Sequence, residues 1–343
     1  MNHESLSIIH TIEVPCPLCG ADESRPLHQV EDFTYGIPGR YAVVRCCGCR
    51  HLFLNPRPTD ASLLDCYPQH YAPYHGGDDA APESSDGESS AADEPKSLLR
   101  RAIGSIPGLK RFLFWLGQEN ATFLPPSPVP GRSRLLEIGS ADGKFLLAAQ
   151  QAGWVVDGVE PSREAAQRSI DQGLDVQCGM FSEMEVADAS RDAVVYWMVL
   201  EHVTDPAALL KESLRVLTPG GLLALSVPNA GAIERHVFGR YWLGYDAPRH
   251  LQNFTASQLK RLLREFGFED PKIIHQPNTR YWYGSVAAWG GKYFPSHRWP
   301  QRWMDYFTTE PPAWMRWPLL LPGKLIAMLG CSGRITVVAR KPK

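Results

Sequence analysis

Four of the eight cysteines have the spacing of metal ligands. Cys16 and Cys19 form one Cys-x-x-Cys pair, Cys46 and Cys49 form a second, and 26 residues separate the two pairs. Each pair lies in a glycine-containing turn, CPLCG or CCGCR, whose backbone can wrap around a tetrahedral ion. The spacing predicts a zinc ribbon, with Cys47 as an alternative to Cys46; the other interpretation is a set of free structural cysteines. Because protein ligands fill all four positions, we expect a structural zinc that performs no chemistry.

A glycine loop follows an apolar run in the stretch LLEIGSADGKF. Glycine at a junction between strand and helix lets the backbone approach a ligand closely, and the amides of the helix face that ligand. A dinucleotide-binding fingerprint counted from Gly139 needs glycines at positions 141 and 144, where the chain has Ala141 and Lys144. The loop therefore argues against a bound pyrophosphate.

An acidic residue ends the next apolar run. Glu160 follows Glu137 by 23 residues, and a carboxylate at this place can accept the protons of both ribose hydroxyls. The pattern fits any ligand that contains adenosine. In the structural alternative, Gly139 and Gly143 only make a tight turn, and Glu160 is a solvated strand end.

The elements that must position these residues alternate from Arg134 onward. Short apolar runs are separated by helical stretches of about 10 to 15 residues, which predicts a parallel sheet covered on both faces. The segment TASQLKRLLREFGF predicts a helix that is capped by Thr255 and ends at Gly267. DPKIIH and RITVVARK predict later strands. The order of elements indicates a doubly wound α/β fold with an insertion over residues 277–332.

Four motifs in this order resemble the class I S-adenosylmethionine-dependent methyltransferases. LLEIGSADGKFL is similar to their first glycine motif, VDGVEP to the acidic strand end, DAVVYWMVLEHV to the fourth strand, and LRVLTPGGLLALSVPN to the segment through the fifth. The resemblance covers about residues 134–275 and the last strand. It implies an α/β fold with a doubly wound, mostly parallel seven-stranded sheet, and S-adenosylmethionine as the methyl donor.

The resemblance also implies roles for individual residues. The glycine loop would hold the methionine part of the donor, Glu160 the ribose, and residues near the third and fourth strands the adenine or methionine pocket. The implied cofactor-binding residues are Glu137, Gly139, Ser140, Ala141, Gly143, Glu160, Met180, Phe181 and Met198.

Two histidines lie where such a fold builds its acceptor pocket. A sulfonium methyl is already activated, but an acceptor hydroxyl or acidic carbon needs a base, and histidine suits this near neutral pH. His202 follows the fourth strand and His250 follows the fifth. We slightly favour His250 over His202 as the base. In the alternatives, His202 makes a hydrogen bond that fixes a loop or the cofactor, and His250 starts a helix and pairs with Asp246.

Composition divides the chain of 343 residues into four parts. Residues 1–75 form the zinc-ribbon module. Residues 76–97 are predicted to be a disordered acidic linker, because they carry seven acids and no aromatic residue. Residues 98–133 include a basic, apolar helical segment, and residues 134–343 form the methyltransferase domain. A content of 44% hydrophobic and 21% charged residues is typical of a globular protein.

The insertion at 277–332 is rich in tryptophan and basic residues. Six of the ten tryptophans lie in it, and from residue 277 to the end there are ten basic residues and two acids. The composition fits a lid packed on the core, which we prefer, or a peripheral membrane contact. The amino-terminal sequence has no signal-peptide pattern, so we expect a cytoplasmic protein. If the insertion contacts a membrane, we expect that contact at the inner face of the membrane.

Together these features predict methyl transfer to a small-molecule or lipid-linked acceptor, most plausibly a hydroxyl of a sugar-like or quinone-like compound. One alternative is C-methylation of a nucleotide sugar. Another is modification of a nucleic acid or protein held by the zinc ribbon, but three basic residues against four acids between Cys16 and Cys49 disfavour nucleic acid. A third is a cofactor-binding scaffold without activity.

Overall fold

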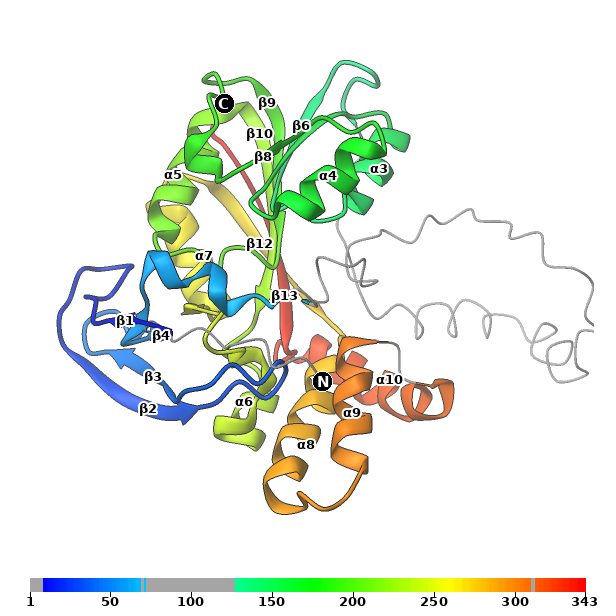
Figure 1. Ribbon diagram of the computed structural model, residues 1–343. Coiled ribbons are helices and arrows are strands. Elements are labelled where there is room, and N and C mark those ends of the chain that lie inside the picture. Colours follow the sequence, from blue (N-terminus) through cyan, green and yellow to red (C-terminus); the bar gives the residue numbers. More distant parts are fainter. Residues whose placement is uncertain (1–8, 69–70, 72–126, 310–311) are drawn as a thin grey trace, which may run out of the picture.

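The computed structural model describes residues 9–68, 71, 127–309 and 312–343. The predicted acidic linker, and most of the predicted helical segment at 98–133, lie outside the described residues. The rest forms a large sheet flanked by helices, with a smaller β module and a group of three helices at one end (Figure 1).

The large sheet has seven strands in the order β12-β13-β10-β9-β6-β7-β8. Its strands are β6 (Arg134–Ile138), β7 (Val155–Glu160), β8 (Val176–Cys178), β9 (Arg191–Trp197), β10 (Leu217–Pro228), β12 (Glu269–Gln276) and β13 (Arg334–Arg340). Only β13 runs antiparallel to its neighbours. The predicted doubly wound, mostly parallel seven-stranded sheet is confirmed.

Helices cover both faces of this sheet, as the alternating apolar residues require. Along β9, Val194 and Tyr196 point to the face covered by helices α5 (Pro206–Val216) and α7 (Ala256–Glu265). Val195 and Trp197 point to the opposite face, covered by α3 (Lys144–Gln151) and α4 (Arg163–Asp171). Successive strand residues alternate between faces, so one run of apolar residues supplies two cores.

Helix α7 begins where its sequence predicts. The Thr255 hydroxyl accepts a hydrogen bond from the Gln258 amide, and the Gln258 side chain accepts one from the Thr255 amide. This capping box satisfies two amides that have no partner within the helix. The insertion before β13 folds as α8 (Arg280–Tyr293), α9 (Trp299–Thr308) and α10 (Ala313–Met328).

The amino-terminal module is completed by a strand from the core. Strands β2 (Ser24–Val30), β3 (Tyr41–Cys46) and β4 (Leu52–Leu54) form an antiparallel sheet, and β11 (Gln252–Asn253) adds its fourth strand. In β11, Gln252 pairs with Phe53 and Asn253 with Leu52. Two short strands, β1 (Thr11–Ile12) and β5 (Arg57–Pro58), pair beside it. The module therefore lies against the core where the parallel strands end (Figure 1).

A buried arginine joins the module to the core. The Arg249 guanidinium is completely buried and donates to both carboxylate oxygens of Asp32 and both of Asp246, over 2.7 to 2.9 Å. Asp32 follows β2, and its carboxylate also accepts three backbone amides of its own loop. These bonds fix the path of the chain through Asp246 and Arg249, just before β11.

We expect Asp32→Ala to lower the free energy of unfolding by about 3 to 5 kcal/mol, because it leaves a buried guanidinium without half of its partners. The matched control is Glu31→Ala, which removes an exposed ion pair with Arg40 and should cost less than about 1 kcal/mol. Urea denaturation followed by circular dichroism measures both. Equal costs for the two variants would show that the buried ion pair does not hold the module.

Candidate active site

The glycine loop between β6 and α3 has a backbone that other residues cannot readily adopt. Gly139 has φ +73° and Gly143 has φ +78°, in the left-handed region. A Cβ atom at Gly139 would lie 2.6 Å from a methyl group of Val199, and one at Gly143 would lie 2.5 Å from a methyl group of Leu174. At both positions, a larger residue is therefore disfavoured by steric contact as well as by the backbone conformation.

Glu160, at the end of β7, is bound to the same loop. One carboxylate oxygen accepts the Ala141 amide at 2.9 Å and the other accepts the Ser162 amide at 2.8 Å. The side chain is buried, which raises its pKa above the ordinary value, while the two amides act in the opposite direction. Each carboxylate oxygen has a second lone pair, so the group can still accept two ligand hydroxyls.

Two further polar atoms of the loop are buried and have no partner among the described residues. They are one carboxylate oxygen of Glu137 and the hydroxyl of Ser140. Burial and the charges of Glu160 and Asp142 raise the pKa of Glu137 well above its ordinary value. A buried polar atom without a partner costs free energy, so the site fits a ligand that supplies donors and positive charge. S-adenosylmethionine carries an ammonium, a sulfonium and two ribose hydroxyls.

The three hydrophobic residues that the resemblance implies for this pocket have different environments. Phe181 is buried in the core beside Ile138 and Val159, at the ends of β6 and β7. The Met180 side chain is 51% exposed. Met198, at the end of β9, packs against the hydrophobic cluster of the α8 and α9 helices. Phe181 thus lies beside the strand that ends at Glu160, and the roles of Met180 and Met198 stay predictions.

The four predicted cysteine ligands lie together in the amino-terminal module. The Sγ atoms of Cys16 and Cys49 are 3.5 Å apart, as are those of Cys19 and Cys46. Four thiolates at about 2.3 Å from a zinc ion are separated by similar distances. Cys47 is exposed and does not belong to the cluster. The cluster is compatible with a zinc site.

The two predicted histidine bases are neighbours, although 48 positions separate them in the sequence. Their ring centroids lie 4.6 Å apart in an edge-to-face arrangement. The Nδ1 atom of His250 is 2.9 Å from the Gly244 carbonyl oxygen, which can only accept a hydrogen bond. His250 therefore donates from Nδ1 and keeps its lone pair on Nε2 when it is neutral.

Glu201, which no sequence motif indicated, completes this cluster. Its carboxylate is buried, neither oxygen has a hydrogen-bond partner among the described residues, and one oxygen lies 4.0 Å from His250 Nε2. Burial raises the pKa of Glu201 to about 8. Burial and the neighbouring His250 lower the pKa of His202 to about 3, and burial lowers that of His250. Both histidines are therefore neutral near pH 7 and keep a lone pair for a proton, although a low pKa makes His202 a weak base.

The connection through Arg249 also holds His202. Nδ1 of His202 lies 3.2 Å from the Arg249 carbonyl oxygen and 2.9 Å from the hydroxyl of Tyr67, which comes from the amino-terminal module. Asp246 lies 3.8 Å from His250 Nε2, and its pKa falls to about 2 because the effect of Arg249 outweighs burial. The histidine cluster is thus built from both parts of the chain.

Glu201, His202 and His250 also have ligand-type atoms within 4.8 Å of one another, a spacing that a metal ion can use. Two guanidinium groups act on the same cluster, because Arg249 lowers the pKa of both histidines and Arg334 that of Glu201. The carboxylate of Asp246 acts in the opposite direction on all three groups. The arrangement is thus compatible with proton transfer and with metal binding.

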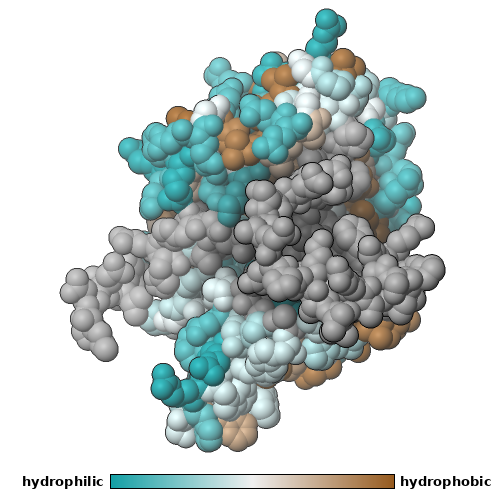
Figure 2. All heavy atoms as spheres, turned by 90° about the vertical axis from the view of Figure 1, so that its right-hand side faces the viewer, coloured by the Kyte–Doolittle hydropathy of each residue, from teal (hydrophilic) through white to brown (hydrophobic). Residues whose placement is uncertain are grey.

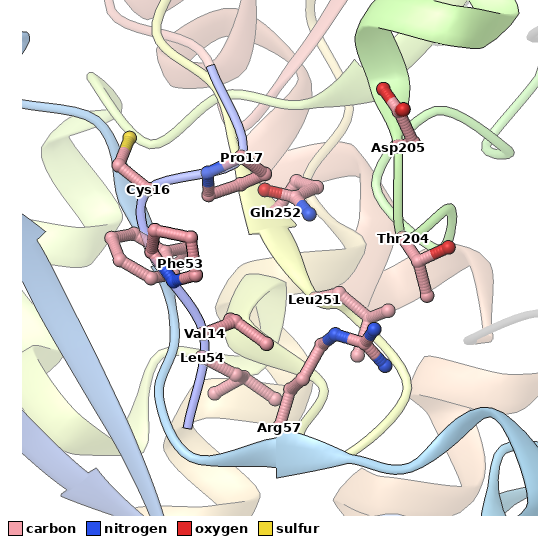
Figure 3. A pocket seen from close by; sticks show the side chains of 11 residues that line it. Val14, Cys16, Pro17, Phe53, Leu54, Arg57, Thr204, Asp205, Leu251 and Gln252 are labelled. Atoms are coloured by element: carbon pink, nitrogen blue, oxygen red, sulfur yellow. The ribbon is translucent and has the colours of Figure 1, made fainter. Parts of the chain in front are cut away.

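A cavity of about 220 Å³ lies at the junction between the module and the core (Figure 3). Val14, Phe53, Leu54 and Leu251 give it apolar walls, and its charged groups already have partners. Arg57 pairs with Asp60, and the Asp205 carboxylate caps α5. The cavity contains none of the predicted cofactor-binding or histidine residues, and we assign no reaction to it.

Comparison with known proteins identifies the family. Residues 108–272 match the family model described as a methyltransferase domain. A probable S-adenosylmethionine-dependent methyltransferase of Mycolicibacterium smegmatis is 30% identical over 180 residues, which are 51% of this chain and 67% of that protein. The chain belongs to the S-adenosylmethionine-dependent methyltransferases. The strand order of the large sheet agrees with this membership.

Other methyltransferases are similar to this enzyme at lower identity. A probable S-adenosylmethionine-dependent methyltransferase of Mycobacterium tuberculosis is 28% identical over 218 residues, covering 61% of this chain and 74% of that protein. The ubiquinone biosynthesis O-methyltransferase of Parvibaculum lavamentivorans is 29% identical over 166 residues, 43% of this chain and 65% of that protein. Methyl transfer is therefore the activity that the names of these relatives share.

Two glycines with nearly the same φ test how the loop binds the donor. Gly139→Ala introduces a Cβ that collides with Val199, so the loop must shift, and we expect the affinity for S-adenosylhomocysteine to fall at least tenfold. Gly131→Ala has the same positive φ, +74°, but its Cβ meets nothing within 4 Å. It should cost stability by backbone strain, about 1 to 2 kcal/mol, and leave affinity unchanged. Isothermal titration calorimetry that gave equal affinities for both variants would contradict this account.

Proposed function

We propose that this methyltransferase transfers the donor methyl group to a hydroxyl of a small-molecule or lipid-linked acceptor, sugar-like or quinone-like in character. The observation that carries the proposal is the cluster of buried Glu201, half-buried His202 and buried His250 at the carboxyl ends of the parallel strands. Ligands bind at this edge in open α/β sheets. A hydroxyl needs a proton acceptor at the moment of transfer, and a neutral imidazole supplies one. The name of the related O-methyltransferase agrees with an oxygen acceptor.

The residues of the glycine loop would hold S-adenosylmethionine. Gly139 and Gly143 admit the ligand close to the backbone, Glu137 and Ser140 offer acceptors to the ammonium, and Glu160 accepts the ribose hydroxyls. When bound, the donor supplies a methyl group on a positively charged sulfur, which needs alignment more than activation. The carboxylates around the loop favour this positive charge by Coulomb attraction.

The geometry favours His202 as the base, whereas the sequence alone slightly favoured His250. His250 is 5% exposed, and its Nε2 atom faces the carboxylates of Asp246 and Glu201. His202 is half-buried, and the Arg249 carbonyl at its Nδ1 favours a lone pair on Nε2. We assign proton removal to His202. The charge of Asp246, which raises the pKa of His202, stabilises the imidazolium that forms.

A comparison of His202→Ala with His250→Ala tests this assignment. Loss of a positioned base costs about 10² to 10⁴ in turnover, whereas the donor does not touch the base, so affinity for S-adenosylhomocysteine should change little. We expect His202→Ala to show the larger loss of methyl transfer from radiolabelled donor to fractionated lipid and sugar extracts. If His250→Ala alone abolishes transfer at unchanged affinity, the roles are exchanged. If neither substitution lowers turnover, the reaction needs no histidine base, and alignment of the donor with the acceptor is sufficient.

We also propose that Cys16, Cys19, Cys46 and Cys49 hold one structural zinc ion. The four Sγ atoms converge, and two of the cysteines are buried, so the ion would lie inside the module and cross-link its two cysteine turns. Its binding energy would be folding energy for this part of the chain. Through Asp32 and Tyr67, the same module supports Arg249 and His202.

Cys19→Ser should remove the zinc and unfold the amino-terminal module, whereas Cys47→Ser, at an exposed cysteine outside the cluster, should keep one zinc per chain. Because the donor loop belongs to the core, both variants should still bind S-adenosylhomocysteine. Methyl transfer should be lost only in Cys19→Ser, since His202 loses its support. Metal analysis and calorimetry give the result; a folded wild-type protein without metal contradicts the zinc proposal.

A further inference from the structure

Helix α10 presents an entirely apolar stripe to solvent. Every exposed position of the described part of this helix and its last turn is apolar. The residues are Trp314, Trp317, Pro318, Leu321, Pro322, Leu325, Met328 and Leu329. The six large side chains among them, all except the prolines, are between 46% and 78% exposed. Single exposed hydrophobic residues are common on protein surfaces, but a continuous row marks an interaction site.

The stripe occupies one face of the helix. Its members recur at intervals of three and four residues, which places them one above another along about 24 Å of helix. The opposite face is packed on the protein: Met315 and Leu320 are buried, and Gly323 lies against Pro277 and Thr279. Figure 2 shows hydrophobic surface on the side of the molecule where α10 lies in Figure 1. The helix is therefore anchored by one face and open on the other.

The charge of the insertion indicates what the stripe binds. Helix α10 contains no acid. The described residues of 277–332 carry six basic side chains against the single acid Asp305. The exposed basic residues are Lys292, Arg298 and Arg302, whereas Lys324 is buried. A two-fold contact between copies of this chain would bring these positive charges together. A layer of anionic lipid headgroups would attract them, and tryptophan is suited to the boundary between headgroups and acyl chains.

The length of the helix fixes how it can meet a bilayer. It has 16 residues, whereas about 20 apolar residues are needed to cross the hydrocarbon. Among the described residues, no helix combines the length and the apolar character that a membrane span requires. An amphipathic helix of this kind lies in the plane of the interface with its apolar face inserted.

We propose that α10 docks this enzyme on membranes that contain anionic lipids, with the stripe from Trp314 to Leu329 inserted among the acyl chains. The docking helix is connected to the reaction edge through α8. The Tyr283 hydroxyl of α8 donates to the Met315 carbonyl at 3.1 Å, and Tyr281 of α8 belongs to the cluster against which Met198 packs. The proposal does not depend on which group receives the methyl.

Vesicle flotation of the full chain tests the proposal. Wild type should float with vesicles of phosphatidylcholine and phosphatidylglycerol, less with phosphatidylcholine alone, and less at high salt. Leu325→Asp puts a charge into the stripe and should lower the bound fraction at least tenfold. The matched control is Leu64→Asp, since Leu64 is also exposed, at 68%, but lies in the amino-terminal module. It should bind as wild type does.

Two results would overturn the proposal. Wild type that does not float, or Leu325→Asp that floats as well as wild type, shows that α10 does not dock on lipid. If in addition light scattering finds a wild-type dimer that Leu325→Asp converts to a monomer, the stripe is an interface between copies. Affinity for S-adenosylhomocysteine, measured on the same samples, reports folding and the donor site. A failure of docking is thus distinguished from a failure of the proposed reaction.

Discussion

The burial of the Arg249 guanidinium between two aspartates is the interaction on which the acceptor side of this enzyme depends. Removing an arginine from water is costly, and the cost is offset only if every donor finds a partner. Here Asp32 and Asp246 supply the carboxylates, the Cys66 carbonyl accepts a further bond, and the Tyr35 ring covers the guanidinium at 4.7 Å. Because Asp32 belongs to the module and Asp246 to the core, the two parts cannot separate without exposing this charge.

The position of Arg249 also determines the histidine cluster. Its carbonyl oxygen holds His202, and the next residue in the chain is His250, whose ring packs on that of His202. The donor loop, by contrast, is built only from the core, through the glycine turn and Glu160. The enzyme thus has a donor half that the sheet alone specifies and an acceptor half that needs the module as well.

Features set by local sequence could be predicted, and features set by distant contacts could not. Short apolar runs between helical stretches predicted the strands, the Thr255 cap predicted the start of α7, and cysteine spacing predicted the cluster of four thiols. Strand β11 has only two residues, too few for a periodic pattern. The bond between Asp32 and Arg249 joins residues 217 positions apart, which no local pattern can show. Glu201 had one signal, its place beside His202, but only the structure shows that its carboxylate is buried without a partner.

A crystal structure of the complex with S-adenosylhomocysteine tests the central claim most directly, because one map locates both halves of the site. The account predicts that the ribose hydroxyls meet the Glu160 carboxylate and that the amino acid part lies along the loop of Gly139 to Gly143. The sulfur should face the cluster of Glu201, His202 and His250. A ligand whose ribose lies away from Glu160, or whose sulfur faces away from the histidines, would contradict the account.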